Sequence, residues 1–453
     1  MVLLLALLLA VSAGVASEAG AQSARPNILL IVTDDQRATD TLGVMGQTRR
    51  FFRGGGKEFT NAFATTPLCC PSRATILTGR YAHNTGIRKN SDDDLDMSTI
   101  FPRLLARNGY RTAMAGKFLN AWRQRRLPHF DHWALLKIAL SKYVRPWFNV
   151  DGETSRFEGY STDLIGRHAV DFLQLFERED DDAPWFLYVA PAAPHSPWIP
   201  AARHARARVP RWRGNPSVRE RDRSDKPAYV RQADYTLADG NLVRTGQLRT
   251  LMAVDDMVGR IVRTLDTLGE KRDTLAIFTS DNGFLWADHR FGGEGSHAGE
   301  KRVPYTPSVE VPFFLRWPGQ VEAGSTDPRL VGNVDIAPTV LSAAGIAPDP
   351  ARPPLDGRSL LSAGARARIL LEYWKEPRRR IPTWASMRTR RFQYVEYYKP
   401  DGRRFFREYY NLRKDPWQLE NLLGDGTRRN DPDVGMLQAR LVRDRQCVGG
   451  ACP

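Results

Sequence analysis

The stretch NILLIVTDDQ, residues 27–36, is an apolar run that ends abruptly in two aspartates. From Ile28 to Val32 no polar side chain interrupts it, which is typical of a strand buried on both faces of a sheet. Two later stretches have the same form: TLAIFTSDNG ends at Asp281 and Asn282, and WFLYVAPAAPHSP leads to His195. The three stretches predict buried strands that place polar side chains just beyond their last residues.

Helical patterns lie between these predicted strands, most clearly in LRTLMAVDDMVGRIVRTLDTLG, residues 248–269. Its apolar residues recur at the spacing of one helix face, from Leu251 to Leu268. Strands that alternate with helices indicate an α/β fold with a large, mostly parallel sheet sandwiched by helices. Binding sites in such sheets lie at the carboxyl ends of strands, which is where the polar residues of the three stretches fall.

The composition changes after Leu361, where the chain becomes more basic and more aromatic. The segment RFQYVEYYKPDGRRFFREYYNL, residues 391–412, alternates in a way that predicts antiparallel strands. We therefore expect a main domain at residues 26–364 and a smaller C-terminal α+β subdomain with an antiparallel sheet at residues 365–453.

The residues at two of the predicted strand ends are all hard oxygen donors. Asp34 and Asp35 follow one strand, and Asp281 and Asn282 follow another. Carboxylate and amide oxygens suit calcium or magnesium better than zinc or copper. Such pairs are also common in turns and at helix caps, so neither pair alone identifies a metal site. Because both pairs occupy the same type of position in one sheet, we predict that they bind a divalent cation together.

The N-terminal stretch MVLLLALLLAVSAGVASEAGAQSA is an apolar run followed by small residues. It predicts a signal peptide at residues 1–22, with an uncleaved membrane anchor as the alternative, because no basic residue precedes the run. The run from Val2 to Val15 is short for a membrane span, and no later stretch is long and apolar enough to cross a bilayer. We expect a secreted or periplasmic protein without a stable membrane span.

The chain has four cysteines, and two of them lie near its C-terminus. Cys447 and Cys452 in CVGGACP are five residues apart around two glycines, a spacing that lets the chain turn back and close a small loop. We predict a disulfide between them, with two free thiols in the tail as the alternative. This pairing leaves Cys69 and Cys70, which are adjacent, without a distant partner.

The formal net charge of +15 is concentrated in arginine clusters, above all RHARARVPRWRGNPSVRERDR, residues 203–223. A basic surface raises the local concentration of anionic ligands, although a merely solvated basic face has the same composition. No recognised nucleic-acid-binding module accompanies the clusters, so we do not expect a nucleic-acid partner. An acidic substrate, such as a sulfated or phosphorylated polymer, fits the charge better.

The stretch CCPSRATILTGRY, residues 69–81, resembles the signature of the type I sulfatases in the alkaline-phosphatase-like superfamily. In that signature a cysteine, here Cys69, begins Cys-x-Pro-Ser-Arg, and Cys70 takes the free position. The family oxidises this cysteine to formylglycine by means of a separate maturation enzyme. The stretches RPNILLIVTDDQ, GKFLN, APHSP, FTSDNG and GEKRVPYTPSVEVP resemble further family segments, and GKFLN with the doubled cysteine is similar to the N-acetylglucosamine-6-sulfatase and arylsulfatase branch.

The resemblance implies a sulfuric ester hydrolase that uses formylglycine and calcium, or magnesium. A hydroxyl of the hydrated aldehyde at position 69 attacks sulfur, and the second hydroxyl then expels sulfate. The implied metal ligands are Asp34, Asp35, Cys69, Asp281 and Asn282, and the implied catalytic and substrate-binding residues are Cys69, Arg73, Lys117, His195, His289 and Lys301.

Four points stay open from the sequence. His297 is the alternative to His289 as the second catalytic histidine, and Leu119 stands where many relatives have a histidine. Each candidate also has a structural alternative, such as a cap, an ion pair or a solvated side chain. The rival functions are a phosphate or phosphonate ester hydrolase of the same superfamily and a non-catalytic protein that binds sulfated glycans.

Overall fold

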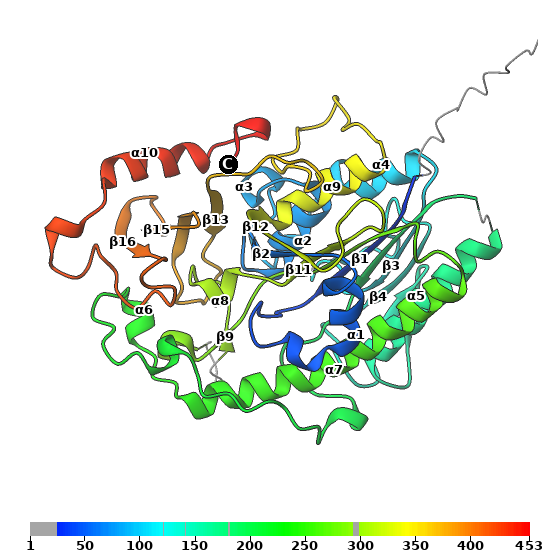
Figure 1. The fold of residues 1–453 in the computed structure, drawn as a ribbon, viewed down its shortest axis with the longest axis horizontal. Coiled ribbons are helices and arrows are strands. Elements are labelled where there is room, and N and C mark those ends of the chain that lie inside the picture. The colour runs from blue at the N-terminus through cyan, green and yellow to red at the C-terminus, as the bar shows by residue number, and fades with distance from the viewer. Residues whose placement is uncertain (1–24, 121, 141, 180–181, 293–298) are drawn as a thin grey trace, which may run out of the picture.

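A large sheet runs through most of the molecule, and a smaller sheet lies beside it (Figure 1). The computed structural model describes residues 25–120, 122–140, 142–179, 182–292 and 299–453. The signal peptide predicted at residues 1–22 and the alternative histidine His297 lie outside the described residues.

The strands of the described chain are β1 (Asn27–Thr33), β2 (Lys57–Phe63), β3 (Arg111–Gly116), β4 (His132–Leu136), β5 (Trp147–Val150), β6 (Glu153–Arg156), β7 (Trp185–Ala190), β8 (Thr274–Ser280), β9 (Leu285–Trp286), β10 (Gly299–Glu300), β11 (Phe313–Arg316), β12 (Ser325–Gly332), β13 (Ile369–Tyr373), β14 (Thr383–Arg388), β15 (Phe392–Tyr398) and β16 (Arg404–Asn411). The α-helices are α1 (Gly46–Thr48), α2 (Cys69–Thr78), α3 (Ala82–Thr85), α4 (Phe101–Arg107), α5 (Ser161–Glu179), α6 (Ala228–Arg231), α7 (Leu237–Thr267), α8 (Thr306–Val309), α9 (Ile336–Ala343) and α10 (Val434–Asp444).

The large sheet has ten described strands in the order β12-β2-β11-β8-β1-β7-β3-β4-β5-β6. Its centre, from β8 through β1, β7 and β3 to β4, is parallel throughout. Antiparallel pairing enters only toward the edges, where β11 runs against both of its neighbours and β4, β5 and β6 form a meander. The predicted α/β class with a mostly parallel sheet is therefore confirmed.

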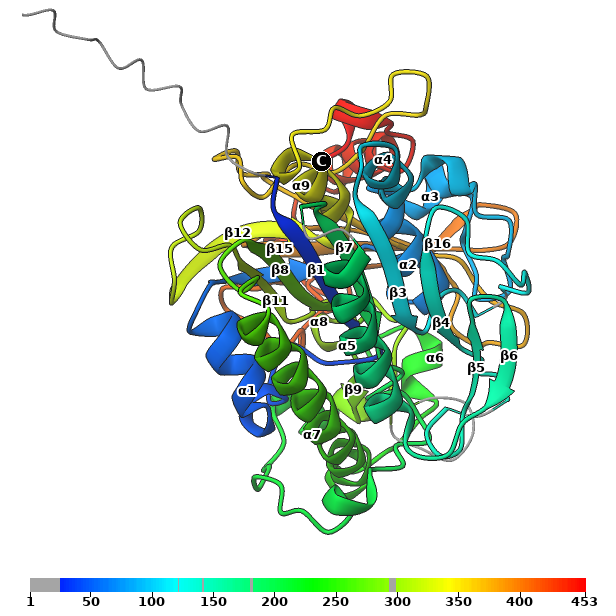
Figure 2. The same cartoon turned by 90° about the vertical axis from the view of Figure 1, so that its right-hand side faces the viewer.

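The predicted strand at residues 27–33 lies in the middle of this sheet, and its side chains divide between two cores. Ile28, Leu30 and Val32 pack with residues of α2, α4 and α9 on one face. Leu29 and Ile31 pack with residues of α5 and α7 on the other. Figure 2 shows these two helices lying along the sheet. Helices on both faces leave no solvent-facing side, which explains why the run carries no polar residue. The long amphipathic pattern at residues 248–269 forms most of α7.

The C-terminal part of the chain forms the second sheet, in the order β13-β14-β15-β16, with antiparallel pairing throughout. The aromatic alternation at residues 391–412 becomes the β15–β16 hairpin, as predicted. The main domain contributes to the core of this part, because Phe63 of β2 and Leu68, which precedes α2, pack in one cluster with residues of β13 to β16. Among the described helices, none combines the length and the apolar character needed to cross a membrane.

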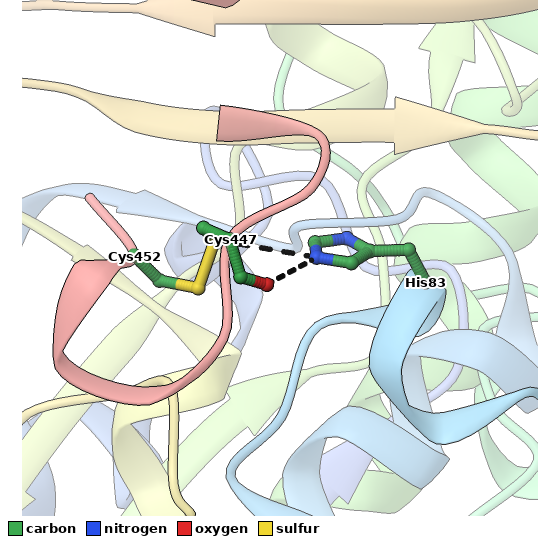
Figure 3. Close-up of side chains that lie close together, drawn as sticks. All are labelled: His83, Cys447 and Cys452. Atoms are coloured by element: carbon green, nitrogen blue, oxygen red, sulfur yellow. Dashed lines mark hydrogen bonds between the residues drawn. A yellow bond between two sulfur atoms is a disulfide. The ribbon is translucent and has the colours of Figure 1, made fainter. Parts of the chain in front are cut away.

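The predicted bond between Cys447 and Cys452 is present, with an S–S distance of 1.98 Å (Figure 3). It closes the C-terminal loop just after α10. Cys69 and Cys70 take no part in a disulfide.

Candidate active site

The register of two neighbouring strands brings the four predicted metal ligands together. β1 and β8 are parallel, and Thr33 lies opposite Ser280, the last residues of the two strands. The chain continues from them into Asp34 and Asp281, so these two carboxylates leave the sheet side by side at its carboxyl edge. The backbone N–H of Asp35 donates to Asp281 Oδ1 at 3.2 Å, which fixes the two strand ends to one another.

Ligand atoms of Asp34, Asp35, Cys69 and Asp281 all lie within 4.8 Å of one another, and all four residues are buried. Asn282 joins them, since its Nδ2 donates to Asp35 Oδ1 at 2.7 Å. Its Oδ1 is buried without a hydrogen-bond partner in the described chain. A buried acceptor normally has a partner, and an orphaned one beside three carboxylates suits a hard divalent cation. The donor set therefore fits calcium or magnesium.

Cys69 is the first residue of α2. Its Sγ accepts from Lys301 Nζ at 2.9 Å and lies 3.5 Å from Asp34 Oδ1. Burial, together with the charge of Asp34, raises the pKa of the thiol to about 12. A thiol that stays protonated is a weak nucleophile, so the unmodified side chain is poorly suited to attack an ester.

Cys70 has a different environment from Cys69. Its backbone N–H donates to Asn90 Oδ1 at 2.9 Å, and its Sγ accepts from the backbone N–H of Asn120 at 3.1 Å. Of the two adjacent cysteines, only Cys69 thus lies in the carboxylate cluster, whereas Cys70 contacts Asn90 and Asn120.

Three buried cations balance the buried carboxylates. Lys117 Nζ lies 2.5 Å from Asp34 Oδ2, Lys301 Nζ pairs with Asp35 Oδ1, and Arg73 Nε donates to Asp281 Oδ2 at 2.9 Å. Burial alone would lower the pKa of both lysines, but the neighbouring aspartates outweigh it and raise them. All three predicted cations therefore remain charged, as the binding of an anion requires.

The pKa values of Asp34 and Asp281 are shifted in opposite directions by the surrounding charges. Burial raises the pKa of Asp34, but Lys117, His195 and Lys301 outweigh it, so the pKa is lowered well below its usual value. Burial and the charge of Asp34 raise the pKa of Asp281 to about 6, even though Arg73 pairs with it. Mutual repulsion between carboxylates this close explains the split, and a cation between them would remove it.

His195 follows β7, the neighbour of β1 on its other side, and its Nε2 lies 3.8 Å from Asp35 Oδ2. About a fifth of the side chain, 21%, is exposed, whereas Asp35 is buried. Burial lowers the pKa of His195 to about 4, so the imidazole is neutral near neutral pH. This histidine lies beyond the end of β7, as the strand pattern predicted, and beside Asp35 of the carboxylate cluster.

His289 has contacts of another kind. Its Nδ1 lies 2.6 Å from Glu220 Oε2, and its ring packs on Tyr305 at a centroid distance of 4.1 Å. The residue is 1% exposed, and none of its contacts within the described residues is to Cys69 or to the four oxygen ligands. Its role as the second catalytic histidine stays a prediction.

Three residues that the sequence analysis did not single out touch the site. Lys142, in the loop between β4 and β5, has its Nζ 3.2 Å from His195 Nδ1, and the hydroxyl of Tyr143 donates to the carbonyl of His195. Gln247 of α7 donates from Nε2 to the carbonyls of Asp35 and Pro194. Only Gln247 had a signal in the sequence, as a polar residue among the apolar positions of a helix.

The arginine-rich segment at residues 203–223 is partly neutralised within the molecule. Arg203 pairs with Asp163 and Asp256, and Arg223 donates to backbone carbonyls. Exposed side chains remain along the segment at Arg206, Arg208, Arg211, Arg213 and Arg221.

Comparison with known proteins identifies the family of this chain. The sulfatase family model matches residues 26–346, and the model of the C-terminal part of N-sulphoglucosamine sulphohydrolase matches residues 295–446. The human N-acetylglucosamine-6-sulfatase is 30% identical to this chain, over 94% of this chain and 86% of its own length. The N-acetylglucosamine-6-O-sulfatase of Bacteroides thetaiotaomicron is 28% identical, over 89% and 83% respectively.

One solved structure, of a protein in complex with its substrate D-glucosamine-2-N,6-O-disulfate, is also similar. It superposes with a TM-score of 0.73 and 25% identity, over 93% of this chain and 97% of that one.

Proposed function

This chain belongs to the sulfatase family, and from that premise we propose that it hydrolyses sulfate esters of sugars through a formylglycine made from Cys69, with a divalent cation. One observation carries the proposal: Cys69 begins a helix inside a buried cluster of three carboxylates, where Lys301 Nζ reaches its Sγ at 2.9 Å. A helix N-terminus and a nearby lysine both favour negative charge at this position.

The residues around Cys69 divide into those that would bind the cation and those that would bind the sulfate group. Asp34, Asp35, Asp281 and Asn282, together with residue 69, would hold the cation. When bound, the cation supplies Lewis-acid stabilisation of oxygens on sulfur. A hydrated aldehyde at position 69 would supply the attacking hydroxyl.

Arg73, Lys117 and Lys301 would hold the sulfate group and the charge that develops on it, since all three are buried cations around residue 69. His195 lies beside Asp35 of the cluster, so it would face the oxygen of the leaving sugar and donate a proton to it. His289 remains the proposed second histidine, and its bond to Glu220 would fix its orientation.

The substrate that we propose is a sulfated amino sugar, alone or in a glycosaminoglycan. Support comes from the relatives named N-acetylglucosamine-6-sulfatase and from the similar structure that holds a disulfated glucosamine. We propose that a further part of the substrate occupies a cavity of about 380 Å³, one of whose lining residues, Glu300, directly precedes Lys301 in the chain. Arg379 and Arg380 line it too, which suits a further anionic group on the substrate.

The remaining parts of the proposal concern location and maturation. The apolar N-terminal pattern supports export to the periplasm or the medium. A formylglycine-generating enzyme is the partner that the motif beginning at Cys69 requires.

Peptide mass spectrometry and two matched variants test the proposal. We expect an aldehyde at position 69 in protein from a host with a maturation enzyme, and hydrolysis of 4-nitrophenyl sulfate and of glucosamine 6-sulfates. Cys69→Ala should lower the rate by roughly 10³-fold or more, because the nucleophile is lost. Cys70→Ala should retain most of the activity, because Cys70 lies outside the carboxylate cluster.

Two outcomes would contradict the proposal. An unconverted thiol in fully active protein would exclude formylglycine as the nucleophile. Converted protein that cleaves phosphonate monoesters but no sulfate ester would identify it as a hydrolase of the rival class.

A further inference from the structure

Lys142 provides the strongest unassigned contact at the site. It is a half-buried residue of the loop between β4 and β5, and its Nζ donates to the carbonyl of Ser196 at 3.1 Å and lies 3.2 Å from His195 Nδ1. This inference rests on the proposed function, because it concerns how His195 acts at the same site.

The loop that carries Lys142 is fixed directly beside it. Tyr143 is 1% exposed, and its hydroxyl donates to the backbone carbonyl of His195. The backbone carbonyl of Tyr143 accepts from the backbone N–H of Ser161 at 2.7 Å. The Tyr143 ring stacks on the ring of Tyr160, with 5.7 Å between centroids. The backbone next to Lys142 is therefore held at a set distance from His195.

Two neighbours of His195 Nδ1 demand opposite protonation states. The carbonyl of Ser196, 2.7 Å away, can only accept, so it would require a proton on Nδ1. The ammonium of Lys142 can only donate, so it requires a lone pair there. Since Lys142 also donates to the Ser196 carbonyl, that carbonyl has a donor without Nδ1.

We infer that Lys142 is a positioning residue that selects the tautomer of His195 with its proton on Nε2. Nε2 is the nitrogen on the side of Asp35, at 3.8 Å from its carboxylate, and hence on the side of the reacting group. In this tautomer His195 can donate its Nε2 proton to the leaving oxygen as the sulfur–oxygen bond breaks, and the ammonium of Lys142 at Nδ1 stabilises the negative charge that the imidazole then carries. Without Lys142, Nδ1–H donates to the Ser196 carbonyl, and Nε2 presents a lone pair that cannot protonate a leaving group.

The dependence on the leaving group distinguishes this role from general support. Alkoxide leaving groups of sugars need a proton, whereas 4-nitrophenolate leaves readily without one. Lys142→Met should lower kcat on a glucosamine 6-sulfate by about 10²-fold, with a loss of less than about threefold on 4-nitrophenyl sulfate. Lys142→Arg retains a donor and should restore most of the activity on the sugar. Lys137→Met, in the same loop, is the control, because the contacts of Lys137 are made by its backbone.

Histidine-selective ¹⁵N NMR reports the tautomer of His195 directly, and the measurement does not depend on enzymatic activity. We expect the His195 signals, assigned by their loss in His195→Asn, to show Nε2–H in the wild type and in Lys142→Arg, and Nδ1–H in Lys142→Met. An unchanged tautomer in Lys142→Met, or an equal loss on both substrates, would overturn the inference. Wild-type protein with converted Cys69 that cleaves neither substrate would instead overturn the proposed function, and the NMR result would still decide the tautomer.

Discussion

Single residues set the positions of the charged groups at the candidate active site. Lys117 follows the last residue of β3, and its backbone N–H donates to the carbonyl of Ala190 at 2.7 Å. Gly116, just before it, has a φ of 117°, a backbone conformation that residues with a side chain rarely adopt. A Cβ on Gly116 would lie 2.1 Å from the same Ala190 carbonyl. The position of the Lys117 ammonium beside Asp34 thus depends on a residue that has no side chain.

Gly116→Ala should damage both stability and activity. The clash with Ala190 and the unfavourable φ should cost about 2 kcal/mol or more, and Lys117 should move away from Asp34. We expect a lower Tm and a loss of sulfate ester hydrolysis in protein whose Cys69 is converted. Gly43→Ala is the matched control, because a Cβ there meets nothing within 4 Å, and its Tm should stay unchanged. Equal behaviour of the two variants would refute this account of Gly116.

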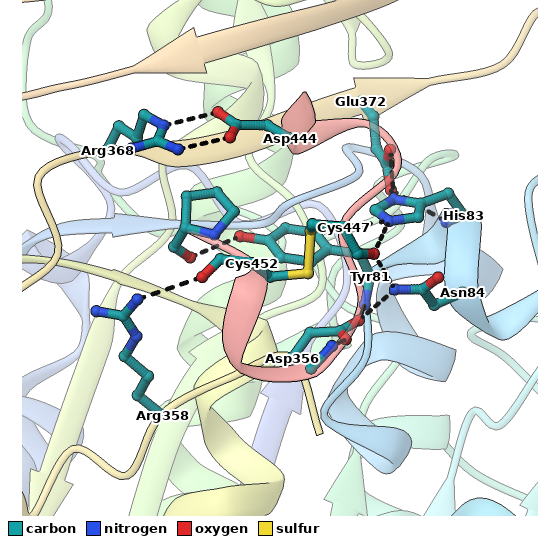
Figure 4. The surroundings of a disulfide bond; sticks show 12 residues. Tyr81, His83, Asn84, Asp356, Arg358, Arg368, Glu372, Asp444, Cys447 and Cys452 are labelled. Carbon is teal, nitrogen blue, oxygen red and sulfur yellow. Dashed lines mark hydrogen bonds and ion pairs between the residues drawn. A yellow bond between two sulfur atoms is a disulfide. The ribbon is translucent and has the colours of Figure 1, made fainter. Parts of the chain in front are cut away.

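At the scale of elements, one contact ties α3 to the C-terminal loop and to β13. Figure 4 shows His83 between Glu372 and the carbonyl of Cys447, beside the disulfide. Its Nδ1 lies 3.0 Å from Glu372 Oε2, and its Nε2 lies 3.0 Å from the carbonyl oxygen of Cys447. Both partners accept, so both nitrogens donate in the imidazolium form. Burial alone would lower the pKa of His83, but the hydrogen bond and charge of Glu372 outweigh it and raise the pKa above 6.5.

The stability of this contact should depend on pH. Because the pKa of His83 is raised in the folded state, its contribution is complete below the unfolded value and is lost as the pH rises through the folded value. The Tm difference between wild type and His83→Gln should therefore shrink as the pH rises from about 6.5 through the raised pKa of His83. Glu372→Gln removes the charge that raises the pKa of His83. In a Glu372→Gln background, the change from His83 to Gln should therefore alter the Tm less than it does in the wild type. A difference that stays constant over this range would show that His83 does not act as an imidazolium.

At the scale of the whole molecule, the two sheets share buried contacts. The backbone N–H of Glu372 in β13 donates to the carbonyl of Thr65 at 2.8 Å. Buried Glu408 of β16 accepts from the hydroxyl of Tyr305, which precedes α8, and from tyrosines of its own sheet. Trp384 of β14 donates from Nε1 to the carbonyl of Arg302, next to Lys301. The segment that carries Lys301 thus lies against the C-terminal sheet.

A fragment that ends at residue 364 should not fold on its own. It would expose the apolar cluster of Phe63, Leu68 and Tyr305 that the C-terminal strands cover, and it would leave the Tyr305 hydroxyl without Glu408. We expect aggregated protein in which Cys69 lacks ordered surroundings, whereas the full chain stays soluble under the same conditions. A soluble fragment with a cooperative thermal transition would show that the main domain folds without residues 365–453.

Much of the fold and of the site was predictable, because the signals are local. An uninterrupted apolar run such as Ile28 to Val32 indicates a strand covered on both faces. Residues directly after such strands share an edge of the sheet, so Asp34 and Asp281 could be expected to meet before the register was known. The five-residue spacing of Cys447 and Cys452 likewise predicted their bond.

Contacts between residues far apart in sequence followed only from the tertiary structure. Nothing in the residues around Lys142 indicates that its ammonium meets His195, 53 positions further on, and nothing around His289 points to Glu220. Neither contact follows from periodicity or from strand order, because each depends on where a loop crosses the edge of the sheet. The sequence by itself thus determined the central strands β1, β7 and β8, the family and the candidate residues of the site. Packing of the loops decided which of those groups touch, because a hydrogen bond needs donor and acceptor within about 3.2 Å of one another, and the sequence does not set that distance between remote residues.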